Sequence, residues 1–290
     1  MTGNILYSPR VNDSIMMQSL EMERLCSLFF ELSNEDRLSI ILKLVKEPMK
    51  LTHIAKELDL TVQETSRQLA RLNEIELVTK DPDGFYVLQP YGRHAIRLFP
   101  GFQFLTEHVD YFNRHTLDLL PERFMGRIGE LRGSVPVTAL MKTFSNIERL
   151  MRESEEFFWY MSDENLISSS HYVLALDALE RGIAIRCIEP LGYRPPPHIV
   201  DSISNEIKTA IDAYRGKEML LDKVFEKIDL VIYMNEKEVG ILALPILTGE
   251  FDYKGFSSKD PKVLEWCKDL HRYYWERGSL RDDVYIKVRD

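Results

Sequence analysis

The sequence has few cysteines and no long apolar run. Its three cysteines, Cys26, Cys187 and Cys267, lie far apart in 290 residues, which argues against a disulfide framework and against a C-x-x-C zinc site. No stretch of 18 apolar residues is present, so no transmembrane helix is expected, and the first residues lack a basic-then-apolar secretory pattern. We therefore expect a cytoplasmic protein that uses no membrane, no metal site and no cofactor.

Positive charge is also scarce. The chain carries 37 Lys and Arg against 46 Asp and Glu, a net charge of −9, which argues against non-specific polyanion binding by the whole chain. Residues 1–100 carry 12 basic and 14 acidic residues, whereas residues 101–290 carry 25 and 32. The first part can still present a basic face, but the second is an acidic body that is not expected to lie on DNA. The length suggests two domains.

Residues 50–72, KLTHIAKELDLTVQETSRQLARL, hold two short helical patterns at a tight joint. Thr61 is followed three residues later by Glu64, the spacing of a capping box that begins a second helix over about 62–74. One side of this helix is expected to be buried, through Val62, Thr65, Leu69 and Leu72. The opposite side carries Gln63, Arg67, Ala70 and Arg71.

A helix with one apolar side and with Gln and Arg on the opposite side is suited to binding in the major groove of DNA. Arg can grip guanine edges or phosphates, and Gln can pair with adenine. The pattern predicts a helix-turn-helix, and the residues expected to contact double-stranded DNA are Gln63, Ser66, Arg67, Arg71 and Lys80. An ordinary solvated helical hairpin remains the alternative reading of this stretch.

The flanking segments favour DNA binding. A helix over about 34–46, capped by Ser33 or Asn34, precedes the pair, with Leu38, Ile41, Leu42 and Val45 as its buried stripe. After the pair, Pro82-Asp83-Gly84 forms a turn between two short strands, near Leu77–Val78 and Phe85–Leu88. Three helices and a hairpin in this order predict a winged helix-turn-helix over residues 33–92.

This segment resembles an archaeal winged-helix transcriptional regulator of the ArsR-like type. The resemblance rests on SNEDRLSIILKL, the helix pair and FYVLQPYGRHAIRL, and covers residues 33–99. It implies a DNA-binding regulator. The paired cysteines that metal-sensing members carry near the recognition region are absent, so metal sensing is not implied.

Two segments flank this domain. Residues 1–32 hold an apolar helix, about 14–32, that either docks on its own domain or forms a dimer contact. Residues 93–130 are expected to be a helical connector rich in aromatic residues, and its residues 93–120 are the alternative dimer contact. Residues 131–290 alternate strands and helices, which predicts an α/β domain. The strands are expected near 157–161, 183–188, 230–233 and 239–244, and the helices near 147–152, 174–179, 199–214 and 263–275.

The second half resembles the C-terminal domain of archaeal methanogenesis regulatory proteins and, more remotely, the effector domain of archaeal sugar-responsive regulators. The matching stretches are FFWYMSDENL, the Asp229–Pro245 hairpin and GEFDYKGFSSKDPKVLEWCKDLHRYYWE, within residues 95–277. The resemblance implies a phospholipase-D-like fold that serves as an effector or assembly domain. The phospholipase motif H-x-K-x4-D is absent, because no histidine has a lysine two residues later, so no catalytic residue is expected.

Polar residues at the expected strand ends could hold a small-molecule effector, since ligand sites of doubly wound sheets lie there. The candidates are Ser162, Asp163, Glu189, Asp252, Tyr253 and Ser257, although Ser and Asp are common in turns in any case. Three functions stay open: a homodimeric DNA-binding regulator, a phosphodiesterase-like enzyme with a winged-helix interaction module, and a winged helix that binds protein instead of DNA.

Overall fold

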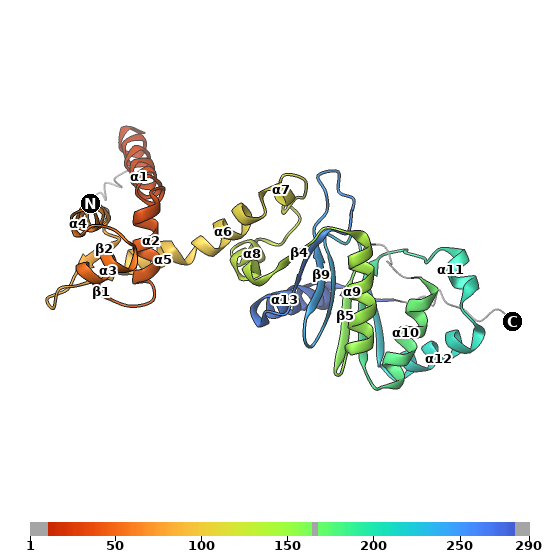
Figure 1. Cartoon of the computed structure of the whole chain (residues 1–290). Coiled ribbons are helices and arrows are strands. Elements are labelled where there is room, and N and C mark those ends of the chain that lie inside the picture. The colour runs from red at the N-terminus through yellow and green to blue at the C-terminus, as the bar shows by residue number, and fades with distance from the viewer. Residues whose placement is uncertain (1–10, 164–167, 282–290) are drawn as a thin grey trace, which may run out of the picture. The chain divides into compact units, whose positions relative to one another are not determined.

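The computed structural model describes residues 11–163 and 168–281, without the side chains of residues 11–19. The chain divides into two compact units, Met1–Leu98 and Phe99–Asp290. Figure 1 shows the helices and strands of each unit.

The first unit contains five helices among its described residues: α1 (Val11–Leu32), α2 (Glu35–Leu44), α3 (Leu51–Glu57), α4 (Val62–Glu74) and α5 (Pro90–Arg97). Its strands are β1 (Met49–Lys50), β2 (Val78–Lys80) and β3 (Phe85–Leu88). They form an antiparallel sheet in the order β1-β3-β2. The predicted winged helix-turn-helix is therefore confirmed. Strand β1 was not predicted, because two residues are too few to give a recognisable strand pattern.

The local signals explain these elements. Asn34 caps α2 by accepting a hydrogen bond from the Arg37 amide, and Pro90 occupies the first turn of α5, where its missing N–H costs nothing. Asp59, with φ 53°, ends the turn after α3 in the left-handed conformation, while the Leu60 amide donates to the Ala55 carbonyl. This closed turn sets the start of α4 immediately after α3.

The core of the first unit lies between α2, α3, α4 and the hairpin. Its fully buried members are Ile40, Ile41, Ile54, Leu69, Leu72, Leu77 and Val78. Three residues expected to be buried are instead exposed: Leu42 at 37%, Val45 at 52% and Val62 at 49%. Their predicted burial was wrong because the stripes of α2 and α4 are narrower than the sequence suggested, and at positions 37 and 68 they include polar side chains.

The second unit is built on a mixed eight-stranded sheet in the order β11-β7-β6-β5-β8-β9-β10-β4 among the described residues. The strands are β4 (Val135–Val137), β5 (Phe157–Met161), β6 (Ala184–Pro190), β7 (Leu220–Phe225), β8 (Val231–Asn235), β9 (Val239–Ala243), β10 (Gly255–Ser258) and β11 (Ser279–Leu280). Within the described part of the chain, only the pairs β5–β6 and β6–β7 are parallel. The predicted α/β domain is confirmed as a mixed sheet. Four of its strands were not predicted, the edge strands β4 and β11 and their inner neighbours β10 and β7.

Helices cover both faces of this sheet (Figure 1). They are α6 (Phe99–Glu107), α7 (Val109–Phe112), α8 (Glu122–Met125), α9 (Leu140–Glu153), α10 (Ser169–Glu180), α11 (Pro197–Ser202), α12 (Asn205–Gly216) and α13 (Pro261–Arg277), with a 3-10 turn η1 at Ile128–Gly133. The single helix expected over 199–214 is two helices, because Ser204 caps α12 through the Ile207 amide.

The alternation of side chains along β8 separates the two cores. Ile232 and Met234 pack with α6, α8, η1 and α13, whereas Val231 and Tyr233 pack with α9 and α10. Because both faces of β8 are covered, all five of its residues are buried, as expected for a central strand.

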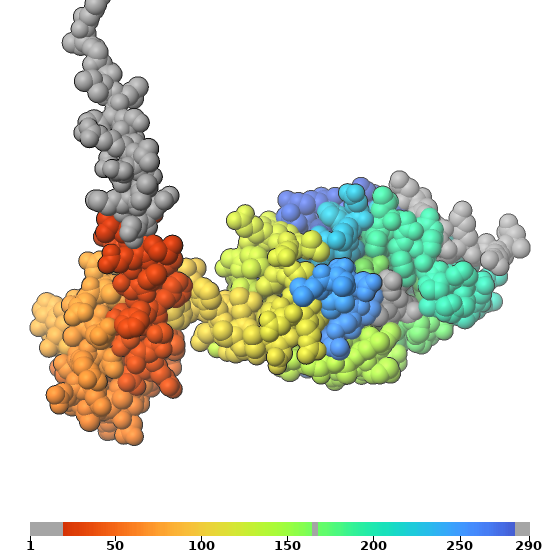
Figure 2. All heavy atoms as spheres, turned by 90° about the horizontal axis from the view of Figure 1, so that it is seen from above, coloured from red at the N-terminus to blue at the C-terminus, as the bar shows by residue number. Residues whose placement is uncertain are grey.

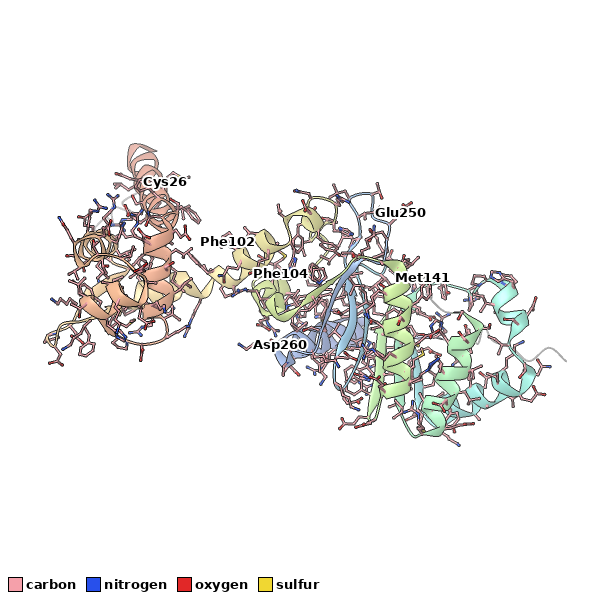
Figure 3. The ribbon with its side chains drawn as sticks, in the orientation of Figure 1. Cys26, Phe102, Phe104, Met141, Glu250 and Asp260 are labelled. Atoms are coloured by element: carbon pink, nitrogen blue, oxygen red, sulfur yellow. The ribbon has the colours of Figure 1, made fainter. Side chains whose placement is uncertain are left out.

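The expected connector, residues 93–130, crosses the division between the units. Its first residues complete α5 of the first unit, and the remainder supplies Phe104, Leu120, Phe124 and Ile128 to a core of the second unit. Phe104, labelled in Figure 3, packs edge-on against Phe112 with ring centroids 5.6 Å apart. The helices of this segment after Leu98 thus pack as part of the second unit.

Candidate nucleic-acid interface

Helix α4 is fixed at its start by a complete capping box. The Thr61 hydroxyl oxygen accepts from the Glu64 amide at 3.2 Å, and the Glu64 carboxylate accepts from the Thr61 amide at 3.0 Å. The Thr61 hydroxyl also donates to this carboxylate at 2.7 Å. These bonds lower the pKa of Glu64, so a negative charge stays at the positive end of the helix. The sequence predicted this cap, and the structure confirms it.

The two sides of α4 differ in exposure. Thr65, Gln68, Leu69 and Leu72 are buried. Gln63, Ser66 and Arg67 are exposed and lie on the outward side together. No ion pair with Arg67 occurs among the described residues. A Gln amide, a hydroxyl and a guanidinium on one exposed helix side form a set of groups that can read base edges or grip phosphates.

Arg71 takes a different position from its expected place on the outward side. Its Nε and Nη2 donate to the Glu31 carboxylate at 2.9 and 2.5 Å, and its guanidinium lies 5.7 Å from the Phe30 ring centroid. The structure therefore brings Gln63, Ser66 and Arg67 together and sets Arg71 against the end of α1.

Glu31, Arg37 and Gln68 are buried polar residues that the sequence analysis missed. Arg37 Nη1 donates to Gln68 Oε1 at 2.9 Å, and Arg37 Nε lies 3.0 Å from Glu31 Oε2. Hydrogen bonds from Arg71, helped by the charge of Arg37, hold the pKa of Glu31 below its ordinary value against the opposing effect of burial. Each of these residues lies among apolar residues on the buried side of its helix. A polar residue at such a position is the sequence signal that could have identified them.

The wing is shaped by its turn. Gly84 has φ +86°, and the Asp81 carboxylate accepts from the Phe85 amide at 2.8 Å, so Asp81 is occupied by the turn itself. Lys80 is exposed, with its ammonium 5.7 Å from the Tyr86 ring centroid. One cation that forms no described ion pair is therefore available on the hairpin.

The expected ligand residues of the second unit fall into separate groups. Ser162 follows β5, and Glu189 lies in the neighbouring parallel strand β6, one residue before its end. The Ser162 amide donates to the Ile188 carbonyl at 3.1 Å. Both side chains are buried. Glu189 accepts from the Tyr160 hydroxyl at 3.2 Å and pairs with Arg281 at 2.7 Å.

Hydroxyl groups surround this pair of strand ends. Burial raises the pKa of Tyr172 and of Tyr233, so both phenols stay neutral hydrogen-bond donors. The Tyr172 hydroxyl has no hydrogen-bond partner among the described residues, although Tyr172 is only 7% exposed. A buried donor without a partner is costly and rare. We call Tyr160, Ser162, Tyr172, Glu189, Tyr233 and Arg281 the strand-end cluster.

Asp163 and Tyr253 are joined by a hydrogen bond of 3.1 Å between the phenol and the carboxylate. Asp252 is instead bound to His115 at 3.1 Å and to the Lys254 ammonium at 3.0 Å. Burial alone would raise the pKa of Asp252, but these bonds outweigh it and leave the pKa lowered.

Ser257 lies on β10, three strands away from β5 in the sheet. The structure therefore does not gather all six expected residues in one place.

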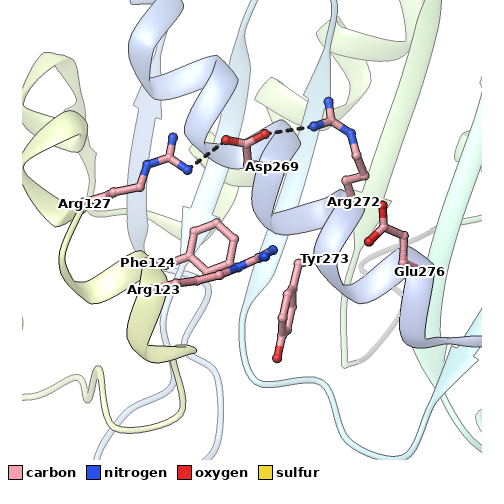
Figure 4. Close-up of a pocket in the computed structure, with 7 residues that line it drawn as sticks. All are labelled: Arg123, Phe124, Arg127, Asp269, Arg272, Tyr273 and Glu276. Carbon is pink, nitrogen blue, oxygen red and sulfur yellow. Dashed lines mark hydrogen bonds and ion pairs between the residues drawn. The ribbon is translucent and has the colours of Figure 1, made fainter.

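Two surface hollows occur elsewhere in the second unit. One, of about 430 Å³, is lined by Tyr111, His115 and Asp252 among others. The other, of about 370 Å³, lies beside α13, where Asp269 accepts from both Arg127 and Arg272 (Figure 4). In this second hollow Arg123 lies 4.3 Å from the Tyr273 ring centroid. Three arginines and two carboxylates line this hollow, and two of the arginines, Arg127 and Arg272, are paired with Asp269.

Within the described residues, no cluster of three or more His, Cys, Asp or Glu side chains is arranged to hold a metal. Among the same residues, no helix is both long and apolar enough to cross a membrane.

Comparison with known proteins identifies one family and several distant structural likenesses. The family model described as "Bacterial regulatory protein, arsR family" matches residues 34–80. None of the curated proteins matches the chain.

Among solved structures, the archaeal chromatin protein TrmBL2, whose report describes a novel mode of DNA binding, is 16% identical with a TM-score of 0.40, covering 85% of this chain and 93% of that one. The phospholipase D family member Nuc from Salmonella typhimurium is 10% identical with a TM-score of 0.34, covering 48% and 91%. The riboflavin-derivative dimethyltransferase RosA from Streptomyces davawensis is 10% identical with a TM-score of 0.26, covering 74% and 67%.

At these TM-scores the structural likenesses carry no argument about activity. The family match coincides with α2, α3, α4 and the first strand of the hairpin. Residues 34–80 thus form a helix-turn-helix that matches the model of the arsR regulatory protein family.

Proposed function

We propose that this chain is a sequence-specific DNA-binding transcriptional regulator whose helix α4 enters the major groove. The observation that carries the proposal is the exposed set of Gln63, Ser66 and Arg67 on a helix that a capping box and a buried stripe hold rigid. Arg is suited to guanine and Gln to adenine, and Lys80 on the wing is suited to a phosphate. The match to the arsR family over residues 34–80 supports the same function.

Genome-wide mapping of DNA occupancy by the full chain tests this proposal. We expect discrete sites that share a sequence motif, and purified protein should bind that motif more tightly than scrambled DNA of equal length. Occupancy without any shared motif would contradict sequence-specific recognition, and a protein that binds no DNA would favour the alternative of a protein-binding winged helix.

We further propose that the regulator is a homodimer that pairs through α1. Met22, Leu25 and Cys26 have the i, i+3, i+4 spacing of one helix stripe, and both apolar side chains are about half exposed, at 59% and 46%. A stripe of this kind on a helix needs a covering partner. Figure 2 shows the end of α1 nearest α2 as the reddest atoms, open on the face in view.

DNA binding supplies the reason for a second copy. Residues 1–100 have a nearly neutral balance of charge, so one winged helix offers few phosphate contacts. Two copies on half-sites about 34–36 Å apart would double them. We therefore propose that the exposed stripe of α1 binds a second copy of the chain.

Cys26 gives a direct test of this pairing, because it is exposed on α1 while Cys187 and Cys267 are buried (Figure 3). A short bifunctional maleimide should cross-link two copies of the full chain at Cys26. The Cys26→Ser variant is the matched control. A chain that gives no cross-linked dimer and has a monomeric mass in light scattering at micromolar concentration would refute dimerisation.

For the second unit we propose an effector or assembly role without catalysis, on a phospholipase-D-like domain of the methanogenesis regulatory type. The strand-end cluster offers neutral phenols and a buried ion pair, groups suited to a small hydroxylated effector. Such an effector changes operator affinity only if it binds the DNA-competent and incompetent states differently, typically by about 5- to 150-fold.

Operator binding by the full chain, measured with and without fractionated cell metabolites, tests this role. Glu189→Gln should abolish any effect of a metabolite. If no fraction alters affinity, the domain serves assembly alone.

The competing function is a phosphodiesterase-like enzyme, favoured by the polar residues at the ends of β5 and β6. We expect no turnover of phosphodiester substrates by the full chain, because the sequence lacks the motif's histidine and lysine. Turnover that disappears in Asp163→Asn or Asp252→Asn would overturn the non-catalytic proposal.

A further inference from the structure

Glu31 joins the last turn of α1 to the recognition helix. Its side chain is 9% exposed and faces two guanidinium groups, those of Arg71 on α4 and Arg37 on α2. Arg71 approaches the carboxylate with two nitrogens, at 2.9 and 2.5 Å. A two-point arginine–carboxylate contact fixes orientation as well as distance.

A second connection runs through Arg37. This side chain donates to the Gln68 amide oxygen at 2.9 Å and to the main-chain carbonyls of Glu31 and Phe30 at 2.7 and 3.3 Å. Gln68 and Arg71 are three residues apart on α4, so they lie on neighbouring turns of one side. Two adjacent points of α4 are therefore tied to the end of α1.

These ties lie away from the exposed set of the same helix. Gln63, Ser66 and Arg67 are exposed, whereas the nitrogens Nε and Nη2 of Arg71 are occupied by a carboxylate that is itself nearly buried. Moving Arg71 to a DNA phosphate would leave Glu31 with Arg37 as its one remaining cationic partner among the described residues. Removing one of the two cationic partners of a nearly buried carboxylate is unfavourable.

We propose that Arg71 and Gln68 are positioning residues and that the Glu31 contacts with Arg71 and Arg37 set the orientation of the recognition helix on α1. Arg71 itself does not contact DNA. This inference rests on the proposed function, since it assigns roles within the proposed DNA-binding helix. The end of α1 therefore influences the orientation of α4, and so does any partner that binds α1.

Operator binding by the full chain at several salt concentrations tests the assignment. Arg71→Ala and Glu31→Gln should each weaken binding by roughly tenfold or more, from the loss of charged hydrogen bonds. The double variant should be no weaker than the weaker single variant, because both changes break the same contact. The slope of log affinity against log salt should stay unchanged in Arg71→Ala.

Arg71→Lys separates positioning from phosphate contact. Lysine keeps the charge but loses the two-point geometry, so a positioning role predicts that Arg71→Lys is nearly as weak as Arg71→Ala. A phosphate contact would instead tolerate lysine, and its loss in Arg71→Ala would reduce the salt slope by about 0.9 for each contact. That slope change, tolerance of lysine, or tighter binding by Glu31→Gln would overturn the inference.

Amide hydrogen exchange of the DNA-free full chain keeps this test separate from the proposed function. Glu31→Gln and Arg71→Ala should both speed exchange in the last two turns of α4, whereas the control Arg152→Ala, on α9, should leave those amides unchanged. Failure of the wild-type chain to bind any DNA would refute the proposed function alone. Unchanged exchange in α4 of both variants would refute the coupling to α1.

Discussion

Replacing Met22 and Leu25 by glutamate should dissociate the proposed homodimer. Burying a large apolar side chain contributes about 1.5–3 kcal/mol, and these two side chains are 59% and 46% exposed in the single chain. About half of that free energy, roughly 1 kcal/mol for each side chain, is therefore available to pairing. Four such side chains in two copies give about 4 kcal/mol, or close to a thousandfold change in the dimer dissociation constant. Burial of new carboxylates would add to this loss.

Sedimentation over a range of protein concentrations measures this change. The substitutions should not unfold the monomer, because both positions are exposed and glutamate is a good helix former. The matched control is Met141→Glu on α9, where another methionine is 74% exposed. An unchanged dissociation constant in the Met22/Leu25 double variant, or an equal loss in Met141→Glu, would refute pairing through this stripe of α1.

Three further predictions concern the fold. Gly92→Ala should destabilise the first unit by about 1–3 kcal/mol in thermal unfolding, because an added Cβ would lie 2.4 Å from the Leu77 carbonyl oxygen, whereas Gly126→Ala, with open space around it, should be nearly neutral. Thr61→Ala should cost about 0.5–2 kcal/mol through loss of the α4 cap, and a cost no greater than that of Thr52→Ala, on an exposed position of α3, would contradict the capping role. The pKa of Glu31 is lower in the folded chain than its unfolded value of about 4.5, so its stabilising effect is complete above the unfolded pKa and is lost as the pH falls through the folded pKa. The free energy of unfolding of Glu31→Gln should therefore depend less steeply on pH in the acid range. An identical pH dependence in the variant and the wild-type chain would contradict the ion pairs.

The first unit was largely predictable because its signals are local. The Thr61–Glu64 cap, the Pro82-Asp83-Gly84 turn and the apolar spacing of α4 each act within a few residues. The cap and the turn occur as predicted, and of the predicted stripe of α4 all but Val62 is buried. The burial of Gln68 could not be predicted, because it depends on Arg37, 31 residues away in the chain. Arg71 was placed on the outward side by helical spacing, and only the position of Glu31, 40 residues earlier, shows what it contacts.

The second unit was predictable in class but not in detail. The central strands β5, β6, β8 and β9 are dense in apolar residues on both faces, so their sequences identify them. The edge strands were missed because they are short or partly exposed, as in β4 and β11, and long-range pairing alone defines them.

The strand-end cluster shows the same limit at the level of side chains. Ser162 and Glu189 were visible at strand ends, whereas Tyr172 on α10 and Arg281 near β11 join them only through the fold.

Operator affinity of the Arg67→Ala full chain tests the central claim most directly. Arg67 is exposed on the outward side of α4, and loss of a base contact should weaken binding by about 1–3 kcal/mol. Arg152→Ala removes the same charge from an exposed position on α9 of the acidic second unit and should leave affinity unchanged. Reduced affinity in Arg67→Ala alone is the predicted result, and equal affinity of the two variants and the wild-type chain would contradict recognition of DNA by this helix.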